Sequence, residues 1–186
     1  IYGIRLLEAL RDCGIETHLV MSRSAEITLA HETDYKVAQV RALADRWYQQ
    51  ADIGAAIASG SFRTMGMVVA PCSVRSMSEI ATGVTSGLLT RAADVVLKER
   101  RRLVLLTREA PLSLVHIENM AAVTRAGAVV LPASPGFYGA PRSIDDLVDH
   151  VVARALDLID VPNDLSVRWG VDGAGDRTGS PSPDAR

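Results

Sequence analysis

The chain has 186 residues, of which 48% are apolar and 23% are charged, as in an ordinary single globular domain. Its net charge of −2 gives neither the basic excess of a nucleic-acid-binding protein nor the acidic excess of a solvating tail. No apolar run reaches the roughly 18 residues of a membrane span. Two cysteines and four histidines without a CxxC motif do not make a zinc site. We therefore expect a cytoplasmic protein with no metal, no nucleic acid and no membrane partner.

The hydrophobic pattern predicts helices that alternate with short apolar strands. In chain order we expect a helix ending at Gly14, a strand over 15–21, a short helix over 24–31, a mostly helical stretch over 35–50, a strand over 67–71, a helix over 77–98 broken near 83–87, a strand over 103–107, a helix over 114–125, a strand over 128–131, and a helix from Ser143 to about Ile159. This alternation indicates an α/β protein with a parallel sheet and helices on both faces.

Both ends of the chain carry their own expectations. The first seven residues already have the pattern of a helix, so we expect a further strand and its loop before residue 1. We expect one domain over residues 1–160. Residues 161–186 become rich in Gly, Ser, Pro and Asp, which predicts a partly disordered tail. Trp169 in this tail is a candidate for docking on a neighbouring subunit.

Ligands of parallel α/β sheets bind where the strands end, and this rule selects four loops. They are 22–24, 72–76, 108–113 and 132–141. In the first loop, the Ser22 hydroxyl can hold a phosphate or a ring carbonyl, or can simply cap the next helix; the two readings are equally supported. The second loop has the hydroxyls and amides of an anion-binding turn, and its Cys72 is more easily read as a small buried thiol than as a nucleophile.

The third and fourth loops carry charged and aromatic side chains. Arg108 can fork onto a phosphate, and Glu109 beside it can carry a proton if burial raises its pKa; the alternative is a plain surface ion pair. Phe137 and Tyr138 can stack on a planar cofactor and supply a phenol, or Phe137 can anchor the loop by being buried. In the basic run at 98–102, which otherwise compensates a helix dipole, Lys98 alone can turn inward.

The histidines carry a weaker signal. His116 and His150 lie on predicted helices, and His18 lies in a predicted strand. Each is more often a packed or exposed histidine than a catalyst.

Several of these segments, taken in order, resemble the flavin prenyltransferases of the UbiX/Pad1 family. The resemblance extends from residue 1 to about residue 169, and the stretch 72–102 is similar to the B subunits of hydroxyarylic acid decarboxylase operons. The matching motifs are RAADVVLKER at 91–100, REAPLS at 108–113, HIENM at 116–120, LPA at 131–133, PGFY at 135–138, and DLV to VVAR within 146–154.

This resemblance implies a Rossmann-like or flavodoxin-like, doubly wound, three-layer α/β/α fold in a homo-oligomer that is often a dodecamer, with FMN between subunits. It implies transfer of a dimethylallyl group from dimethylallyl phosphate to reduced FMN. Bonds form at flavin N5 and C6, and the prenylated FMN then serves a separate UbiD-type decarboxylase. No metal is needed.

Matching motif positions imply roles for individual residues. FMN contacts fall on Ser22, Ser73, Ser76 and Arg108, with Val74 and Arg75 in the same loop; substrate contacts fall on Tyr138, Arg154 and Lys98; and proton handling falls on Glu109, assisted by Glu32. A departing phosphate calls for Lys, Arg and a phenol, which agrees with this set.

Two features depart from the family pattern. The family begins with a strand and a Gly-x-Ser/Thr-Gly loop that touches the flavin, whereas this sequence starts just after that segment. Arg75 is bulkier than the small residue of some relatives. Two alternatives remain open, namely a flavin-dependent decarboxylase and a flavin-binding accessory subunit of an aromatic acid decarboxylase.

Overall fold

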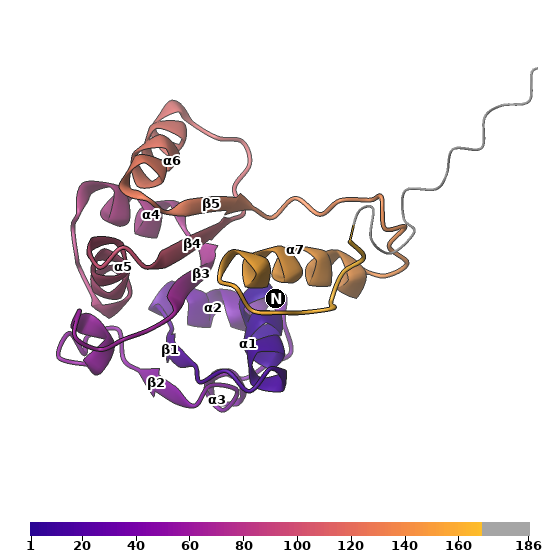
Figure 1. Cartoon of the computed structure of the whole chain (residues 1–186), viewed down its shortest axis with the longest axis horizontal. Helices are drawn as coiled ribbons and strands as arrows, with labels where there is room; N and C mark the ends of the chain where they lie inside the picture. Colours follow the sequence, from indigo (N-terminus) through magenta and orange to yellow (C-terminus); the bar gives the residue numbers. More distant parts are fainter. Residues whose placement is uncertain (169–186) are drawn as a thin grey trace, which may run out of the picture.

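The computed structural model describes residues 1–168 and has parallel strands alternating with helices (Figure 1). In chain order the elements are α1 (Tyr2–Asp12), β1 (His18–Val20), α2 (Arg23–Glu32), α3 (Val37–Arg41), β2 (Arg46–Tyr48), the 3-10 turn η1 (Ala56–Ala58), β3 (Gly66–Cys72), α4 (Val74–Thr82), α5 (Leu88–Lys98), β4 (Arg102–Thr107), α6 (Leu114–Ala126), β5 (Val129–Pro132) and α7 (Ile144–Leu158). None of the described helices is long and apolar enough to cross a membrane.

Strand β4 is the centre of the larger sheet, which has the order β3-β4-β5 with every pair parallel. Its residues Leu103 to Leu106 are each at most 1% exposed. Leu103 and Leu105 belong to one core cluster, and Val104 between them belongs to another. Side chains of a strand alternate between the two faces of a sheet, so β4 is covered on both faces.

The two faces of this sheet are covered by different helices. Helices α4, α5 and α6 supply Met77, Ala93 and Val123 to the first cluster. Helices α1 and α7 lie side by side over the other face, where Leu6 and Val152 join the second cluster (Figure 1). The fold is therefore a doubly wound, flavodoxin-like three-layer sandwich, which confirms the predicted class.

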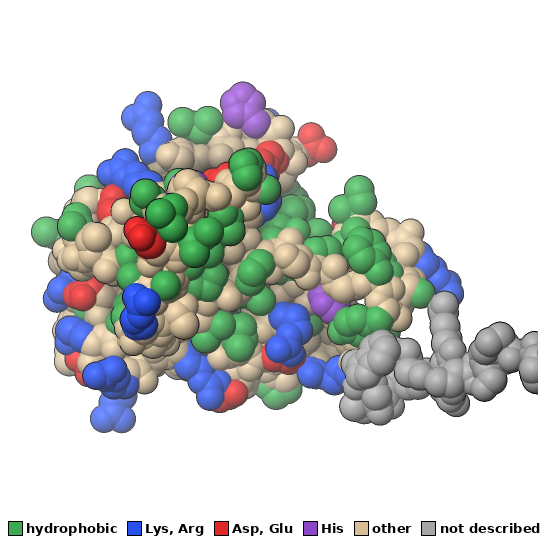
Figure 2. All heavy atoms as spheres, turned by 90° about the horizontal axis from the view of Figure 1, so that it is seen from above, with side chains coloured by type: hydrophobic (Ala, Val, Ile, Leu, Met, Phe, Trp, Pro, Cys, Tyr) green, Lys and Arg blue, Asp and Glu red, His purple; other side chains and the backbone are tan. Residues whose placement is uncertain are grey.

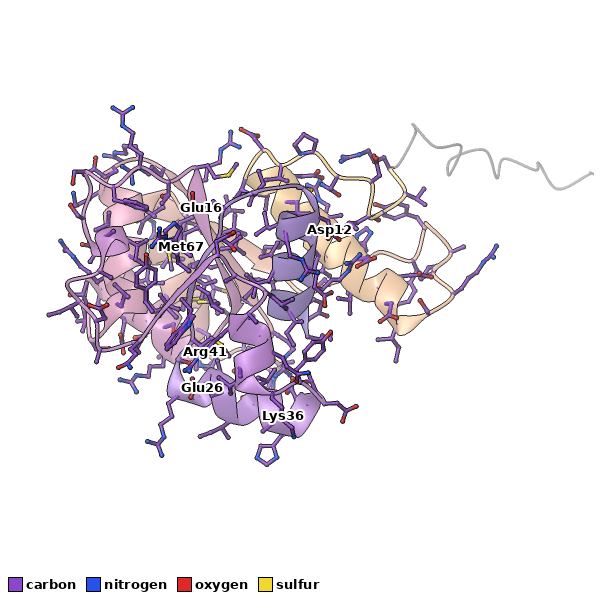
Figure 3. The ribbon with its side chains drawn as sticks, turned by 90° about the horizontal axis from the view of Figure 1, so that it is seen from below. Asp12, Glu16, Glu26, Lys36, Arg41 and Met67 are labelled. Atoms are coloured by element: carbon purple, nitrogen blue, oxygen red, sulfur yellow. The ribbon has the colours of Figure 1, made fainter. Side chains whose placement is uncertain are left out.

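Strands β1 and β2 form a separate parallel pair at the side of the molecule that also holds α2 and α3 (Figure 1). Leu29 of α2 and Val40 of α3 pack there against Ile4 and Leu7 of α1. Arg41 of α3 points toward Glu26 of α2, with 2.7 Å between the charged atoms (Figure 3). Helix α1 thus contributes to the core on both sides of the molecule.

The predicted helical stretch over 35–50 is wrong in its second half, where the structure has strand β2. Asp45 accepts hydrogen bonds from the backbone N–H of Thr17 at 2.7 Å and from its hydroxyl at 3.1 Å, which fixes the start of β2 beside β1. The guanidinium of Arg41 lies 4.1 Å from the ring centre of Trp47, within cation–π range. These contacts between distant residues override the local helical preference.

Two expectations about the chain ends have different outcomes. Strands β1 and β3 are not hydrogen-bonded to each other among the described residues, and the expected further strand stays a prediction. At the other end, Val161 is 2% exposed and belongs to the core beside α7, so the folded unit continues past residue 160. Trp169 lies outside the described residues.

Candidate functional site

Three helices begin where strands end, at the edge that the sequence selected. The N-caps of α2, α4 and α6 are Ser22, Ser73 and Ser113. Their hydroxyl oxygens accept hydrogen bonds from backbone N–H groups of the first helical turn at 3.1, 3.1 and 3.3 Å. Ser22 is thus the N-cap of α2, which was one of the two roles predicted for it. The positive ends of three helix dipoles lie at this edge and favour an anion there.

The turn after β3 presents two serine hydroxyls at the start of α4 and keeps its cysteine buried. The Ser73 hydroxyl donates to the Ser76 hydroxyl at 3.1 Å, and Val74 opens α4. Cys72 is 5% exposed, and burial raises the pKa of its thiol to about 12. A thiol with so high a pKa carries almost no thiolate at neutral pH. The reading of Cys72 as a small buried residue is confirmed.

Glu79 organises the start of α4 and the following turn, and no sequence motif pointed to it. Its carboxylate accepts hydrogen bonds from Arg75 at 2.9 Å, from the Ser86 hydroxyl at 2.5 Å and from the Thr90 hydroxyl at 3.2 Å. These donors, the Ser86 hydroxyl first, lower the pKa of Glu79. Glu79 therefore pairs with the exposed Arg75 on one turn of α4 and ties α4 to α5 through Thr90.

Arg108 and Glu109 do not pair with each other. The Arg108 guanidinium lies 3.3 Å from Glu32, and the two side chains are 58% and 48% exposed. An ion pair this exposed contributes little to stability, so Arg108 remains available to a ligand. Glu32 is the last residue of α2, which follows β1, and Arg108 comes directly after β4. The Arg108–Glu32 pair therefore joins the end of α2 to the end of β4. Glu109 is exposed and has no hydrogen-bond or ion-pair partner among residues 1–168.

Tyr138 and Arg154 lie on another part of the molecule, beside α7. The rings of Tyr138 and His150 meet edge to face, with 5.5 Å between centres. Arg154 is one helical turn after His150 and donates to Asp157 at 2.8 Å. Phe137 is 72% exposed, so the alternative in which it anchors its loop by burial is wrong.

Lys98 is remote from the other predicted residues within one chain. It is the last residue of α5 and forms an ion pair with Glu99 at 2.5 Å. It precedes β4, whereas Arg108 follows it, and six strand residues span about 20 Å. The predicted site residues therefore fall into three groups in a single chain: the edge with Arg108, the α7 group with Tyr138, and Lys98.

Comparisons with known proteins decide the family. The Flavoprotein family model matches residues 1–156. The flavin prenyltransferase UbiX of Escherichia coli K12 is 54% identical over 172 residues, which cover 91% of this chain and 91% of that protein. The chain belongs to the UbiX flavin prenyltransferases. The predicted resemblance is confirmed.

Two solved structures of UbiX relatives share the fold closely. One is described as AnUbiX (PadA1) in complex with FMN and dimethylallyl pyrophosphate; it has a TM-score of 0.89 and 52% identity, covering 90% of this chain and 89% of that one. The other is a dodecameric FMN-dependent UbiX-like decarboxylase from Escherichia coli O157:H7, with a TM-score of 0.88 and 50% identity, covering 90% and 91%.

The burial of Cys72 gives a prediction about thiol reactivity. We expect iodoacetamide at pH 8 to label Cys13, which is exposed, and to leave Cys72 unlabelled in the folded protein, because the raised pKa leaves little thiolate. Mass spectrometry should find one label in native protein and two in denaturant. A Cys13→Ser variant should take none in the native state. Labelling of that variant at the rate of a free thiol would contradict the assignment.

Proposed function

We propose that this chain transfers a dimethylallyl group from dimethylallyl phosphate to reduced FMN, and that the prenylated FMN serves a UbiD-type decarboxylase. The observation that carries the proposal is the 52% identity, over nine-tenths of the chain, to a relative described with FMN and dimethylallyl pyrophosphate bound. We place the reaction in the cytoplasm, where Cys13 and Cys72, both free, remain reduced.

The carboxyl edge of the sheet fits a phosphate-bearing flavin. The helix starts capped by Ser22 and Ser73 present free N–H groups and a positive dipole end, and Arg108 adds a cation there. We assign Ser22, Ser73, Ser76 and Arg108 to FMN, with Val74 and Arg75 along the same turn. When bound, the reduced flavin supplies the nucleophile of the reaction.

The chemistry of an allylic phosphate accounts for the remaining residues. Breaking its C–O bond leaves negative charge on the phosphate, which the cations of Lys98 and Arg154 and the phenol of Tyr138 stabilise. Glu109, exposed and unpaired within residues 1–168, accepts or donates the proton. Glu32, which is already held by Arg108, assists it from the end of α2.

These residues meet only if chains assemble. Tyr138 in the loop before α7, Arg154 on α7, and Lys98 before β4 need a second or third copy to reach an Arg108 edge. A 50% identical relative is dodecameric by its description. Apolar side chains lie exposed on the face around α6 (Figure 2). Leu114, Val115 and Ile117 there are 69%, 61% and 51% exposed, as expected of a surface covered by another copy. We propose a homo-oligomer, a dodecamer by analogy, with sites shared between copies.

The decisive experiment is to incubate the protein with reduced FMN and dimethylallyl phosphate and to weigh the flavin by mass spectrometry. A prenyltransferase raises the flavin mass by one dimethylallyl group. An unchanged flavin that stays bound would instead identify an accessory flavin carrier. Release of CO2 from an aromatic acid by this protein alone would identify a decarboxylase.

Glu109→Gln is expected to slow turnover by about 100-fold or more, because general acid–base groups contribute roughly 10²–10⁴. FMN binding should stay within about twofold, since the amide keeps the size of the side chain. Single-turnover mass spectrometry and flavin fluorescence titration measure the two quantities. Parallel loss of both would make Glu109 a structural residue.

Sharing of sites between copies predicts complementation. Arg108→Ala and Arg154→Ala are each expected to be nearly inactive as pure oligomers. When the two variants are co-expressed in equal amounts, about a quarter of two-copy sites should combine intact halves and restore activity in proportion. If the mixed oligomers are as inactive as the parents, Arg108 and Arg154 of each site come from the same chain.

A further inference from the structure

The loop that carries Tyr138 leaves the sheet after β5 and runs over α7 without forming a helix or strand (Figure 1). One anchor of this loop is aromatic. The rings of Tyr138 and His150 are 5.5 Å apart between centres and inclined by 76°, the edge-to-face geometry that aromatic pairs prefer. His150 lies in the middle of α7, a rigid element, so it gives the phenol a fixed support.

Gly136 makes room for this packing. A methyl group at Gly136 would lie 2.7 and 3.0 Å from two carbons of the Tyr138 ring, and 3.4 Å from Cε1 of His150. Real side-chain contacts are not that short, so any larger residue would push the Tyr138 ring away. The loop backbone, the tyrosine ring and the histidine ring are thus packed in one compact group.

The orientation of His150 is itself fixed from the other side. Its Nδ1 lies 3.1 Å from the hydroxyl of Ser166, within hydrogen-bond distance. Ser166 belongs to residues 161–168, which we call the strap. Val161 in the core and Asn163, which donates to Asp157 at 3.1 Å, hold the strap against α7.

The strap is also held at its end and reaches the Tyr138 loop directly. Arg168 donates to Asp157 at 2.9 Å. Burial alone would raise the pKa of Asp157, but the hydrogen bonds from Arg168 and Asn163 and the nearby charge of Arg154 outweigh it and lower that pKa. A methyl group at Gly139 would lie 3.6 Å from Val167 of the strap. The strap therefore lies beside the loop at Gly139 and is within hydrogen-bond distance of its histidine support.

We propose that His150 is a positioning residue that sets the Tyr138 phenol relative to Arg154, and that Ser166 of the strap fixes His150 for this task. Arg154 follows His150 by one turn on the same face of α7. By supporting the Tyr138 ring, His150 therefore holds the phenol on the side of α7 that carries Arg154, the other proposed phosphate ligand. His150 itself touches no substrate. The inference rests on the proposed function for the roles of Tyr138 and Arg154.

The test compares KM for dimethylallyl phosphate with kcat and with FMN affinity. His150→Ala should raise KM by about 2- to 10-fold, the range expected for loss of one edge-to-face pair. FMN affinity should not change. His150→Phe, which keeps the ring contact, should restore most of the loss, and Ser166→Ala should raise KM about twofold through loss of its one hydrogen bond to His150. His31→Ala, at an exposed histidine of α2, is the matched control and should leave KM unchanged.

A double variant separates positioning from a general loss of structure. If His150 acts through the phenol, adding His150→Ala to Tyr138→Phe should raise KM by less than the product of the two single effects. Effects that multiply, or an unchanged KM in His150→Ala, would overturn the proposal.

A readout without substrate keeps this test distinct from that of the proposed function. Chymotrypsin cuts after Phe137 and Tyr138, and His150→Ala should speed cutting there relative to wild type and to His31→Ala. Faster cutting in a protein that makes no prenylated flavin would uphold the support of the loop by His150 and refute the prenyltransferase. Unchanged cutting in an active enzyme would overturn the role of His150.

Discussion

The burial of β4 on both faces is the constraint on which the rest of the structure depends. Four consecutive side chains from Leu103 to Leu106 are removed from water and alternate between the two helical layers. Burying an aliphatic side chain of this size contributes roughly 1.5–3 kcal/mol, and only helices on both faces can achieve it here. Parallel order then places the ends of β3, β4 and β5 at the same edge, so the capped starts of α4 and α6 follow at the edge where Arg108 leaves the sheet.

Much of this arrangement was predictable from sequence because it is encoded locally. Continuous apolar runs identified β3, β4 and β5, and a serine before a helical pattern gave the cap at Ser22 as one of two predicted roles, whereas the caps at Ser73 and Ser113 were placed in loops. The same logic selected the loops that carry Arg108 and Tyr138. Strand β2 was missed because it is only three residues long and depends on Asp45 contacting Thr17, 28 residues earlier.

The candidate site was less predictable than the fold, since its residues are related by contacts that spacing does not reveal. Sequence alone offered a surface ion pair between Arg108 and its neighbour Glu109 as the alternative to a ligand site, whereas the structure pairs Arg108 with Glu32, 76 residues away. Glu79 gave no signal because a single glutamate in a helix is usually solvated. Motif matching named Lys98 and Arg154, but it could not tell that one chain keeps them apart from the sheet edge.

Helices α1 and α7 lie against the same face of the sheet, and Arg5 and Asp149 join them through two hydrogen bonds across 144 residues of sequence. Helix α1, the first described helix, therefore reaches this neighbour only after α7, the last described one, has been made. On the ribosome, the part of α1 that packs against α7 stays uncovered until α7 has emerged, although Ile4 and Leu7 of α1 can already pack against α2 and α3, so this face of the domain is completed late in synthesis. A chain that stops short of α7 would leave this face of the sheet covered only by α1, exposing apolar surface that promotes aggregation.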